Sequence, residues 1–282
     1  MTTVPLFFLA CFLCNFVLAY DEEWALRNVK IAGAAYCLPS ALQSFNVGAY
    51  SVPDFVPLSV WSNSSLQFFT GYDAQHDNIV VSIRGSMDFS NWVSDFNARL
   101  THPFPYAPDV GVHSGFWGEY SIMKSALHQS LLSARSLLNV STLVVVGHSS
   151  GGANAHLLSY ELSSPGGPLP GFIVRLLSTY GSPRVGNAAF SRSSAASLAF
   201  RHDRATHYHD LFPHLPERVL GYEHGAQEVF YDEEGAEYKL CEDGEGEDWS
   251  CSNSCGVACK SVADHMVYLK VEMGTPPCTA KV

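Results

Sequence analysis

A short apolar segment that runs directly into a glycine-rich turn constrains the fold of this chain more than any other feature. Leu143–Val146 carries only aliphatic side chains, which is typical of a strand buried on both faces of a sheet. Gly147-His-Ser-Ser-Gly151 follows without a spacer, and Ser150–Leu162 is predicted to form a helix. A strand, a sharp turn and a helix in this order are typical of sheets that helices flank. The segment therefore predicts an α/β fold.

The segments on either side fit the same architecture. Leu66–Tyr72 and Ile79–Ile83 are rich in β-forming residues and are predicted to form a hairpin through Asp77-Asn78. Apolar residues recur near every 3.6 positions from Glu119 to Leu138, which predicts an amphipathic helix. Further strands are expected at four segments: Phe172–Tyr180, Ala205–His209, Glu228–Tyr231 and Glu237–Leu240. We expect a mainly parallel central sheet with helices on both sides and antiparallel additions.

Length and charge limit the classes of function. A chain of 282 residues with 47% hydrophobic content can bury one sizeable core, and no internal repeat or long linker suggests a second one. One domain is therefore predicted over residues 20–282. The chain has 27 acidic and 16 basic residues, a formal net charge of -11. This charge repels phosphate backbones, so nucleic acid is not an expected partner.

The first 19 residues look like a targeting segment. Met1–Ala19 is apolar, contains no charged side chain and is shorter than the roughly 20 residues of a spanning helix. Val17 and Ala19 are small residues at the positions that a signal peptidase reads. We therefore predict a cleaved signal peptide over residues 1–19 and secretion of the remainder. Because no Lys or Arg lies near Met1, an uncleaved anchor is the alternative.

The cysteines and two sequons agree with secretion. An even set remains after residue 19, which favours three disulfides in an oxidising compartment: Cys37, Cys241, Cys251, Cys255, Cys259 and Cys278. Six cysteines allow 15 pairings, and sequence alone does not choose among them. The alternative is a zinc site that combines Cys255 and Cys259 with His265. Asn63-Ser-Ser65 and Asn139-Val-Ser141 are sequons that are glycosylated only on the secretory route.

The turn after the apolar strand is a candidate site of nucleophilic chemistry. Gly147-His-Ser-Ser-Gly151 matches G-x-S-x-G, and its position between a strand and a helix is the setting of a nucleophile elbow. Gly147 and Gly151 lack the side chains that would clash in such a sharp turn. Ser149 is then expected at the exposed tip. The alternative is an ordinary glycine-rich turn between strand and helix.

A serine hydroxyl needs a histidine to take its proton and a carboxylate to orient that histidine. In elbow-type folds these groups follow the serine in the order Asp, His. Asp210 comes just after the predicted strand Ala205–His209, at the end where α/β sheets place their sites, whereas Asp203 comes before it. The residues alone leave three candidates for the base: His265, His214 and His224.

Several further motifs support naming a family. They are IVVSIRGS (79–86), Asn91-Trp92, VHSGF (112–116), VVVGHSSGG, TYGSPRVGN (179–187), HDLFPHLP (209–216), GYEHGAQEVF (221–230), WSCSNS (249–254) and DHMVY (264–268). With this set, spread over roughly residues 24–280, the chain resembles the fungal-type, class 3 lipases of the α/β-hydrolase fold. The resemblance implies that Ser149, Asp210 and His265 form a catalytic triad, and it selects His265 as the base.

The activity that the resemblance implies is hydrolysis of carboxylic esters by a secreted serine hydrolase, through an acyl-enzyme and without a metal or organic cofactor. A triacylglycerol is the expected substrate. A feruloyl esterase and a phospholipase are alternatives within the same fold, because the pocket walls set the substrate. A catalytically silent lipid-binding module is the alternative from another class.

An acyl-transfer site also needs hydrogen-bond donors for the oxyanion. The amide of Ser150, just after the nucleophile, is one expected donor. The resemblance implies that Ser86, after Arg84-Gly85, supplies the other. The family usually has leucine where this chain has Ser150, so the packing behind this site is expected to differ.

The residues after Ser86 predict a short amphipathic helix. Its apolar face is formed at spacings i, i+3, i+4 and i+7 by Phe89, Trp92, Val93 and Phe96. The resemblance implies a lid that covers the acyl pocket in water and contacts a lipid interface when it opens. The alternative is a helix that packs permanently on the core. The resemblance also implies two disulfides, Cys37–Cys278 and Cys241–Cys251, which leaves Cys255 and Cys259 to pair with each other.

Overall fold

The computed structural model describes residues 20–87, 98–196, 201–242, 247–274 and 278. The predicted signal peptide (residues 1–19) and the four predicted lid residues, Phe89, Trp92, Val93 and Phe96, lie outside the described residues. In the described part, no helix combines the length and the apolar character needed to cross a bilayer.

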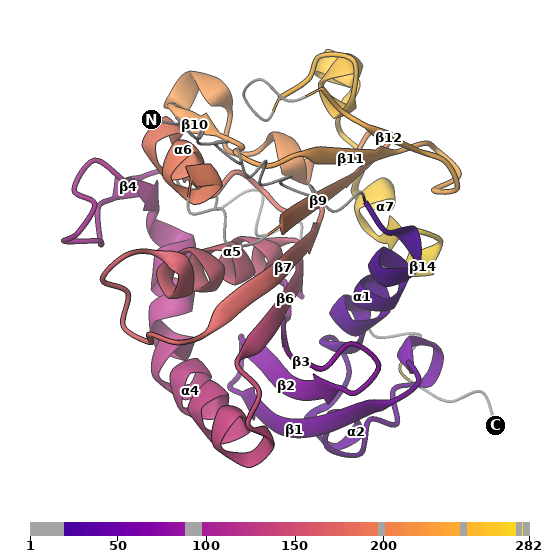
Figure 1. The fold of residues 1–282 in the computed structure, drawn as a ribbon. Helices are drawn as coiled ribbons and strands as arrows, with labels where there is room; N and C mark the ends of the chain where they lie inside the picture. The colour runs from indigo at the N-terminus through magenta and orange to yellow at the C-terminus, as the bar shows by residue number, and fades with distance from the viewer. Residues whose placement is uncertain (1–19, 88–97, 197–200, 243–246, 275–277, 279–282) are drawn as a thin grey trace, which may run out of the picture.

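A twisted sheet of eight strands forms the centre of the molecule (Figure 1). In spatial order, which is also their order along the chain, the strands are β1 (Phe55–Ser62), β2 (Gln67–Asp73), β3 (Asn78–Ile83), β6 (Thr142–His148), β7 (Ile173–Tyr180), β9 (Arg201–His207), β11 (Glu228–Tyr231) and β12 (Tyr238–Leu240). The five strands from β3 to β11 run parallel, and β1, β2 and β12 add antiparallel pairs at the edges. This confirms the predicted α/β architecture with a mainly parallel sheet.

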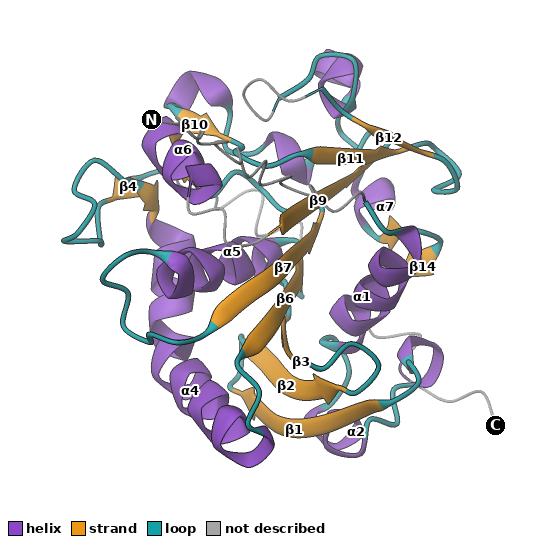
Figure 2. Cartoon of the chain, in the orientation of Figure 1, coloured by secondary structure: helices purple, strands orange, loops and turns teal. Residues whose placement is uncertain are grey.

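Helices cover both faces of the sheet (Figure 2). One face packs against α4 (Ser114–Leu138), α5 (Ser150–Ser163) and α6 (Ala188–Ala196). The other face packs against α1 (Glu22–Ala34), α2 (Pro39–Ser44) and α7 (Val262–His265). Because side chains alternate along a strand, Val144 and Val145 of β6 enter the two different cores. The wholly apolar sequence of β6 follows from burial on both faces.

Two smaller sheets and four 3₁₀ turns complete the described structure. One sheet contains β4 (Leu100–Thr101), β5 (Val112–His113), β8 (Gly186–Asn187) and β10 (Tyr222–Glu223), and the other contains β13 (Val267–Tyr268) and β14 (Val271–Glu272). The 3₁₀ turns are η1 (Gly48–Tyr50), η2 (Phe212–His214), η3 (Arg218–Leu220) and η4 (Ser252–Ala258). Turn η2 follows β9 along the chain, η3 precedes β10, and η4 follows β12.

Two element boundaries differ from the sequence-based expectation. The long helix begins at Ser114 rather than Glu119, because the His113 side chain caps it by accepting the Phe116 N–H at 3.3 Å. Strand β9 begins at Arg201 rather than Ala205, so Asp203 lies inside the strand and not before it. The first half of β9 is polar, and Arg201 pairs there with Asp203 at 2.6 Å. Because an ion pair and not apolar burial stabilises this half of β9, its sequence lacks the apolar residues from which a strand is predicted.

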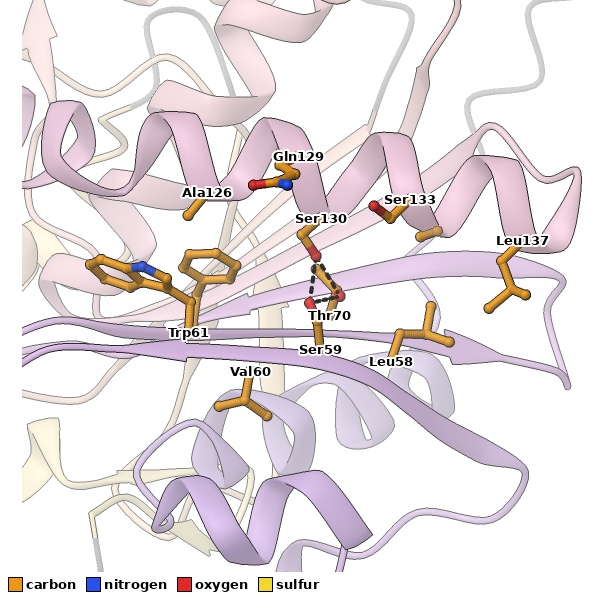
Figure 3. Close-up of a pocket in the computed structure, with 12 residues that line it drawn as sticks. Leu58, Ser59, Val60, Trp61, Thr70, Ala126, Gln129, Ser130, Ser133 and Leu137 are labelled. Carbon is orange, nitrogen blue, oxygen red and sulfur yellow. Dashed lines mark hydrogen bonds between the residues drawn. The ribbon is translucent and has the colours of Figure 1, made fainter.

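A surface groove lies between α4 and the edge of the sheet formed by β1 and β2 (Figure 3). It encloses about 330 Å³ and is mainly apolar at its two ends, near Trp61 and near Leu137. The hydroxyls of Ser59, Thr70 and Ser130 bond to one another at 2.6 to 2.8 Å in its middle. None of the predicted catalytic residues lines this groove.

Three buried histidines are neutral parts of the structure. Burial is the largest cause that lowers the pKa of His148, His156 and His224, and the charge of Arg204 lowers the last two further. The pKa of His156 falls to about 3. The Nε2 atoms of the three rings bond to two backbone carbonyls and one hydroxyl at 2.6 to 2.8 Å. The three imidazole rings are therefore neutral in the folded protein, because a charged ring in the interior would lose its hydration.

The free energy of unfolding should therefore fall as the pH decreases below about 6.5. The unfolded chain binds a proton on each histidine near that pH, whereas the folded chain does so only at lower pH. Each neutral buried histidine contributes about 1.4 kcal/mol per pH unit to this loss. Urea unfolding at a series of pH values measures the slope, and H156Q should reduce it. A constant stability over the range just below pH 6.5 would contradict the prediction.

Candidate active site

Ser149 occupies the sharp turn between β6 and α5. Its backbone has a φ of 59°, which is unfavourable for a residue with a side chain, and its N–H bonds to Tyr180 O at 2.9 Å. The two flanking glycines leave no room for any side chain. A Cβ on Gly147 would lie 2.3 Å from Gly151 O, and a Cβ on Gly151 would lie 2.2 Å from Ile83 O. This strained turn at the carboxyl end of a central strand has the geometry of a nucleophile elbow.

Asp210 and His265 are in direct contact although 55 residues separate them. His265 Nδ1 lies 2.8 Å from Asp210 Oδ2, and both side chains are buried. Because a carboxylate accepts, Nδ1 carries the proton and Nε2 is the nitrogen that can accept another one. Phe212 N–H donates to Asp210 Oδ1 at 2.8 Å, and the Phe212 ring stacks on the imidazole with centroids 3.7 Å apart. The imidazole is therefore fixed in both tautomer and orientation.

Two residues near this pair were not anticipated from the sequence. The hydroxyl of Tyr268 donates to Asp210 Oδ2, the same oxygen that His265 contacts. Gly181, which follows β7, has a φ of 59°, and a Cβ there would lie 2.8 Å from Asp210 Oδ2, His265 Nδ1 and the Tyr268 hydroxyl. Only glycine leaves room for these three groups. Tyr268 lies in the motif DHMVY, and Gly181 lies in the motif TYGSPRVGN. No local sequence pattern indicates that these two residues meet in the fold.

The two rival histidines lie elsewhere. His224 Nε2 bonds to the backbone oxygen of Pro213 at 2.8 Å. His214 Nε2 lies 3.8 Å from Cys255 Sγ. Of the three candidate bases, the structure brings His265 into contact with Asp210.

A hydrogen-bonded chain ties the backbone of His265 to the strand that precedes Ser149. His148 Nε2 lies 2.8 Å from His265 O, and His148 Nδ1 lies 2.7 Å from the Tyr36 hydroxyl. A carbonyl can only accept, so Nε2–H donates to it and Nδ1 accepts from Tyr36. The Gly85 amide in turn hydrogen-bonds the Tyr36 oxygen. A ring that uses both nitrogens in this way must be neutral, which agrees with the lowered pKa of His148.

The same histidine relates Ser149 to His265. The rings of His148 and His265 pack with centroids 4.4 Å apart, and Ser149 is the residue after His148. Ser149 and His265 therefore both lie near the carboxyl end of β6. The Ser149 side chain is buried, and its Oγ makes no hydrogen bond to the residues that the structure describes.

The two predicted oxyanion residues are also in contact. Ser86 follows β3 and Ser150 opens α5, and these two positions are neighbours because β3 pairs with β6. Ser86 N–H donates to Ser150 Oγ at 3.0 Å, and the two hydroxyl oxygens lie 3.3 Å apart. The N-terminal end of α5 points its amides toward this region, which favours negative charge there.

The six cysteines form three disulfides: Cys37–Cys278, Cys241–Cys251 and Cys255–Cys259. The zinc alternative pairs the wrong histidine with Cys255 and Cys259, because His265 contacts Asp210 and it is His214 that lies near these sulfurs. A disulfide also leaves no thiolate for a metal. Both sequon asparagines, Asn63 and Asn139, are exposed.

Comparison with known proteins decides the family. A family model described as Lipase (class 3) matches residues 80–220, half of the 282 residues. The chain belongs to the class 3 lipase family. This confirms the family predicted from the sequence motifs.

Relatives of this class 3 lipase family member include secreted fungal enzymes. It is 31% identical over 210 residues to the secreted mono- and diacylglycerol lipase 1 of Fusarium solani. The aligned region covers 71% of this chain and 61% of that protein. It is also 31% identical over 198 residues to a lipase of Rhizomucor miehei, and this aligned region covers 70% of this chain and 53% of that protein. The matched regions thus span between half and two thirds of these relatives.

A solved structure shares the fold of this class 3 lipase family member. It is a triacylglycerol lipase whose catalytic centre is formed by a serine protease triad. It superposes with a TM-score of 0.77 at 24% identity and covers 92% of this chain and 97% of its own. At this identity, the likeness is evidence for the fold alone.

Proposed function

We propose that this class 3 lipase hydrolyses carboxylic esters of lipids, with Ser149 as nucleophile, His265 as general base and Asp210 as the group that orients His265. The observation that carries the proposal is the buried 2.8 Å contact between His265 Nδ1 and Asp210 Oδ2. It lies beside the strained turn that presents Ser149. A strained turn and a buried acid–base pair at the carboxyl end of a parallel sheet are typical of a catalytic centre.

The reaction proceeds through an acyl-enzyme. His265 Nε2 takes the proton of Ser149 while Oγ attacks the ester carbonyl, and Asp210 stabilises the imidazolium without being protonated. Ser86 and the Ser150 amide donate to the oxyanion of the tetrahedral intermediate. The imidazolium then protonates the leaving alcohol. Water repeats the sequence on the acyl-enzyme, with His265 as base, and releases the carboxylic acid and the free serine.

The proposed substrates are neutral acylglycerols, and the proposed location is the secretory pathway or the exterior. The relatives named above support both points, since one is a secreted mono- and diacylglycerol lipase and the solved structure is a triacylglycerol lipase. Three disulfides also fit an oxidising compartment. The chain's acidic character favours neutral rather than anionic substrates.

A panel of esters tests the substrate class. We expect turnover of a soluble short-chain ester and of an emulsified long-chain triacylglycerol, with methyl ferulate about 100-fold slower. The same preparation of S149A is the control for contaminating esterase. Faster turnover of methyl ferulate or of phosphatidylcholine than of triacylglycerol would instead assign a feruloyl esterase or a phospholipase. Binding to lipid vesicles without turnover of any ester would assign a silent module.

The predicted lid has its own readout in this panel. If Phe89, Trp92, Val93 and Phe96 form a lid that opens at an interface, the rate on tributyrin should rise when its concentration exceeds the solubility limit. A rate that saturates smoothly through that limit would instead support a helix packed permanently on the core.

A further inference from the structure

The residue after the nucleophile carries a hydroxyl that the proposed mechanism does not yet use. The Ser150 side chain is 2% exposed, and its Oγ lies between the turn that presents Ser149 and the loop that follows β3. A buried hydroxyl needs hydrogen-bond partners, and Ser86 supplies them.

The chemistry of the donor fixes the direction of one of these two bonds. Ser86 N–H can only donate, so Ser150 Oγ accepts it at 3.0 Å. The Ser150 hydroxyl then has one hydrogen to give. Among the residues that the structure describes, the side-chain acceptor within reach is Ser86 Oγ at 3.3 Å. If Ser86 Oγ accepts from Ser150, its own hydrogen must point elsewhere, and Ser86 is only half-buried.

We propose that Ser150 is a positioning residue of the oxyanion site. Its hydroxyl holds the Ser86 amide and orients the Ser86 hydroxyl, so that Ser86 donates to the oxyanion through its side chain. The Ser150 amide is the second donor. This assignment rests on the proposed function and deepens it. The backbone amide of Ser150 donates to the oxyanion, and the side-chain hydroxyl of Ser150 positions Ser86.

Chained hydroxyls make this arrangement effective. A hydroxyl that accepts a hydrogen bond becomes a better donor, because the bonds in a chain polarise one another. An oriented donor also needs no reorganisation when charge develops on the substrate oxygen. The effect of Ser150 should therefore appear in the transition state and not in substrate binding.

Four variants test the proposal on a soluble short-chain ester: S150A, S150T, S86A and the double variant S86A/S150A. We expect S150A to lower kcat about tenfold with an unchanged KM, since the neutral hydrogen bond that orients the Ser86 hydroxyl is lost. S86A should lower kcat on the order of 100-fold. The double variant should equal S86A, because Ser150 acts through the Ser86 hydroxyl. S150T keeps a hydroxyl and should restore most of kcat.

The control is S159A, which removes another buried hydroxyl from the same helix. Ser159 Oγ donates within α5 to Ala155 O at 2.9 Å, away from Ser86, so its kcat should match the parent enzyme. Thermal unfolding of each variant establishes that it is folded. An unchanged kcat in S150A, a raised KM with unchanged kcat, or a further loss of kcat on adding S150A to S86A would overturn the proposal. A parent enzyme that hydrolyses no ester would instead contradict the proposed function.

Discussion

Replacement of His265 by alanine should lower kcat by about 10⁶-fold, the size expected when a triad loses its base. His265 Nε2 is the nitrogen that can take the Ser149 proton, because Nδ1 is engaged with Asp210 at 2.8 Å. Without it the serine hydroxyl stays protonated at neutral pH and is a poor nucleophile. Steady-state kinetics on a soluble ester measure the loss.

Two companion variants separate chemistry from folding. The His265 ring stacks between Phe212 and His148, so alanine also leaves a cavity, whereas H265Q preserves most of the volume. H265Q should unfold near the temperature of the parent and still lose nearly all activity. H224Q changes a rival histidine that bonds to Pro213 O, and its kcat should fall less than tenfold. Loss of activity in H224Q together with retention in H265Q would exchange the two assignments.

The exchange of Asp210 for asparagine should lower kcat by about 10⁴-fold while the fold is retained. An asparagine fills the same volume, but its amide group can donate to His265 Nδ1. That bond favours the tautomer with the proton on Nε2, which can no longer accept from Ser149. Phe212 N–H, which donates to Asp210 Oδ1 at 2.8 Å, would hold the amide oxygen at that position and so place the amide group opposite His265 Nδ1.

The same substitution at Asp203 is the matched control. Asp203 lies in β9, the strand that leads to Asp210, and pairs with Arg201 at 2.6 Å. D203N should therefore affect stability and leave kcat within a few-fold of the parent. Equal losses of kcat in D203N and D210N would show that the Asp210 carboxylate acts only through the stability of the fold.

The fold was predictable where local patterns coincide with burial. The apolar run of β6 and the 3.6-residue period of α4 were sufficient to place both elements. The start of β9 was not predictable, because Arg201 and Asp203 are stabilised by a contact with each other rather than by an apolar core. The pattern also carried no sign of the helices before residue 50, whose packing depends on the far face of the sheet.

The candidate site shows the same division. Ser149 and Asp210 follow from rules about strand ends, whereas the choice of His265 over His214 and His224 needed the family motifs. The Tyr36–His148 contact was missed altogether, because 112 residues separate its partners and the G-x-S-x-G pattern leaves the identity of residue 148 open. Such contacts depend on how segments far apart in the sequence pack together in the fold. The local spacing of residues does not indicate that packing.

A fluorophosphonate probe tests the central claim most directly, because it is transferred to an activated serine and can be located by mass spectrometry. We expect one adduct per chain, on the peptide that carries Ser149, with no adduct in S149A and strongly slowed labelling in H265Q. An adduct on a different residue, or undiminished ester hydrolysis in S149A, would contradict the claim.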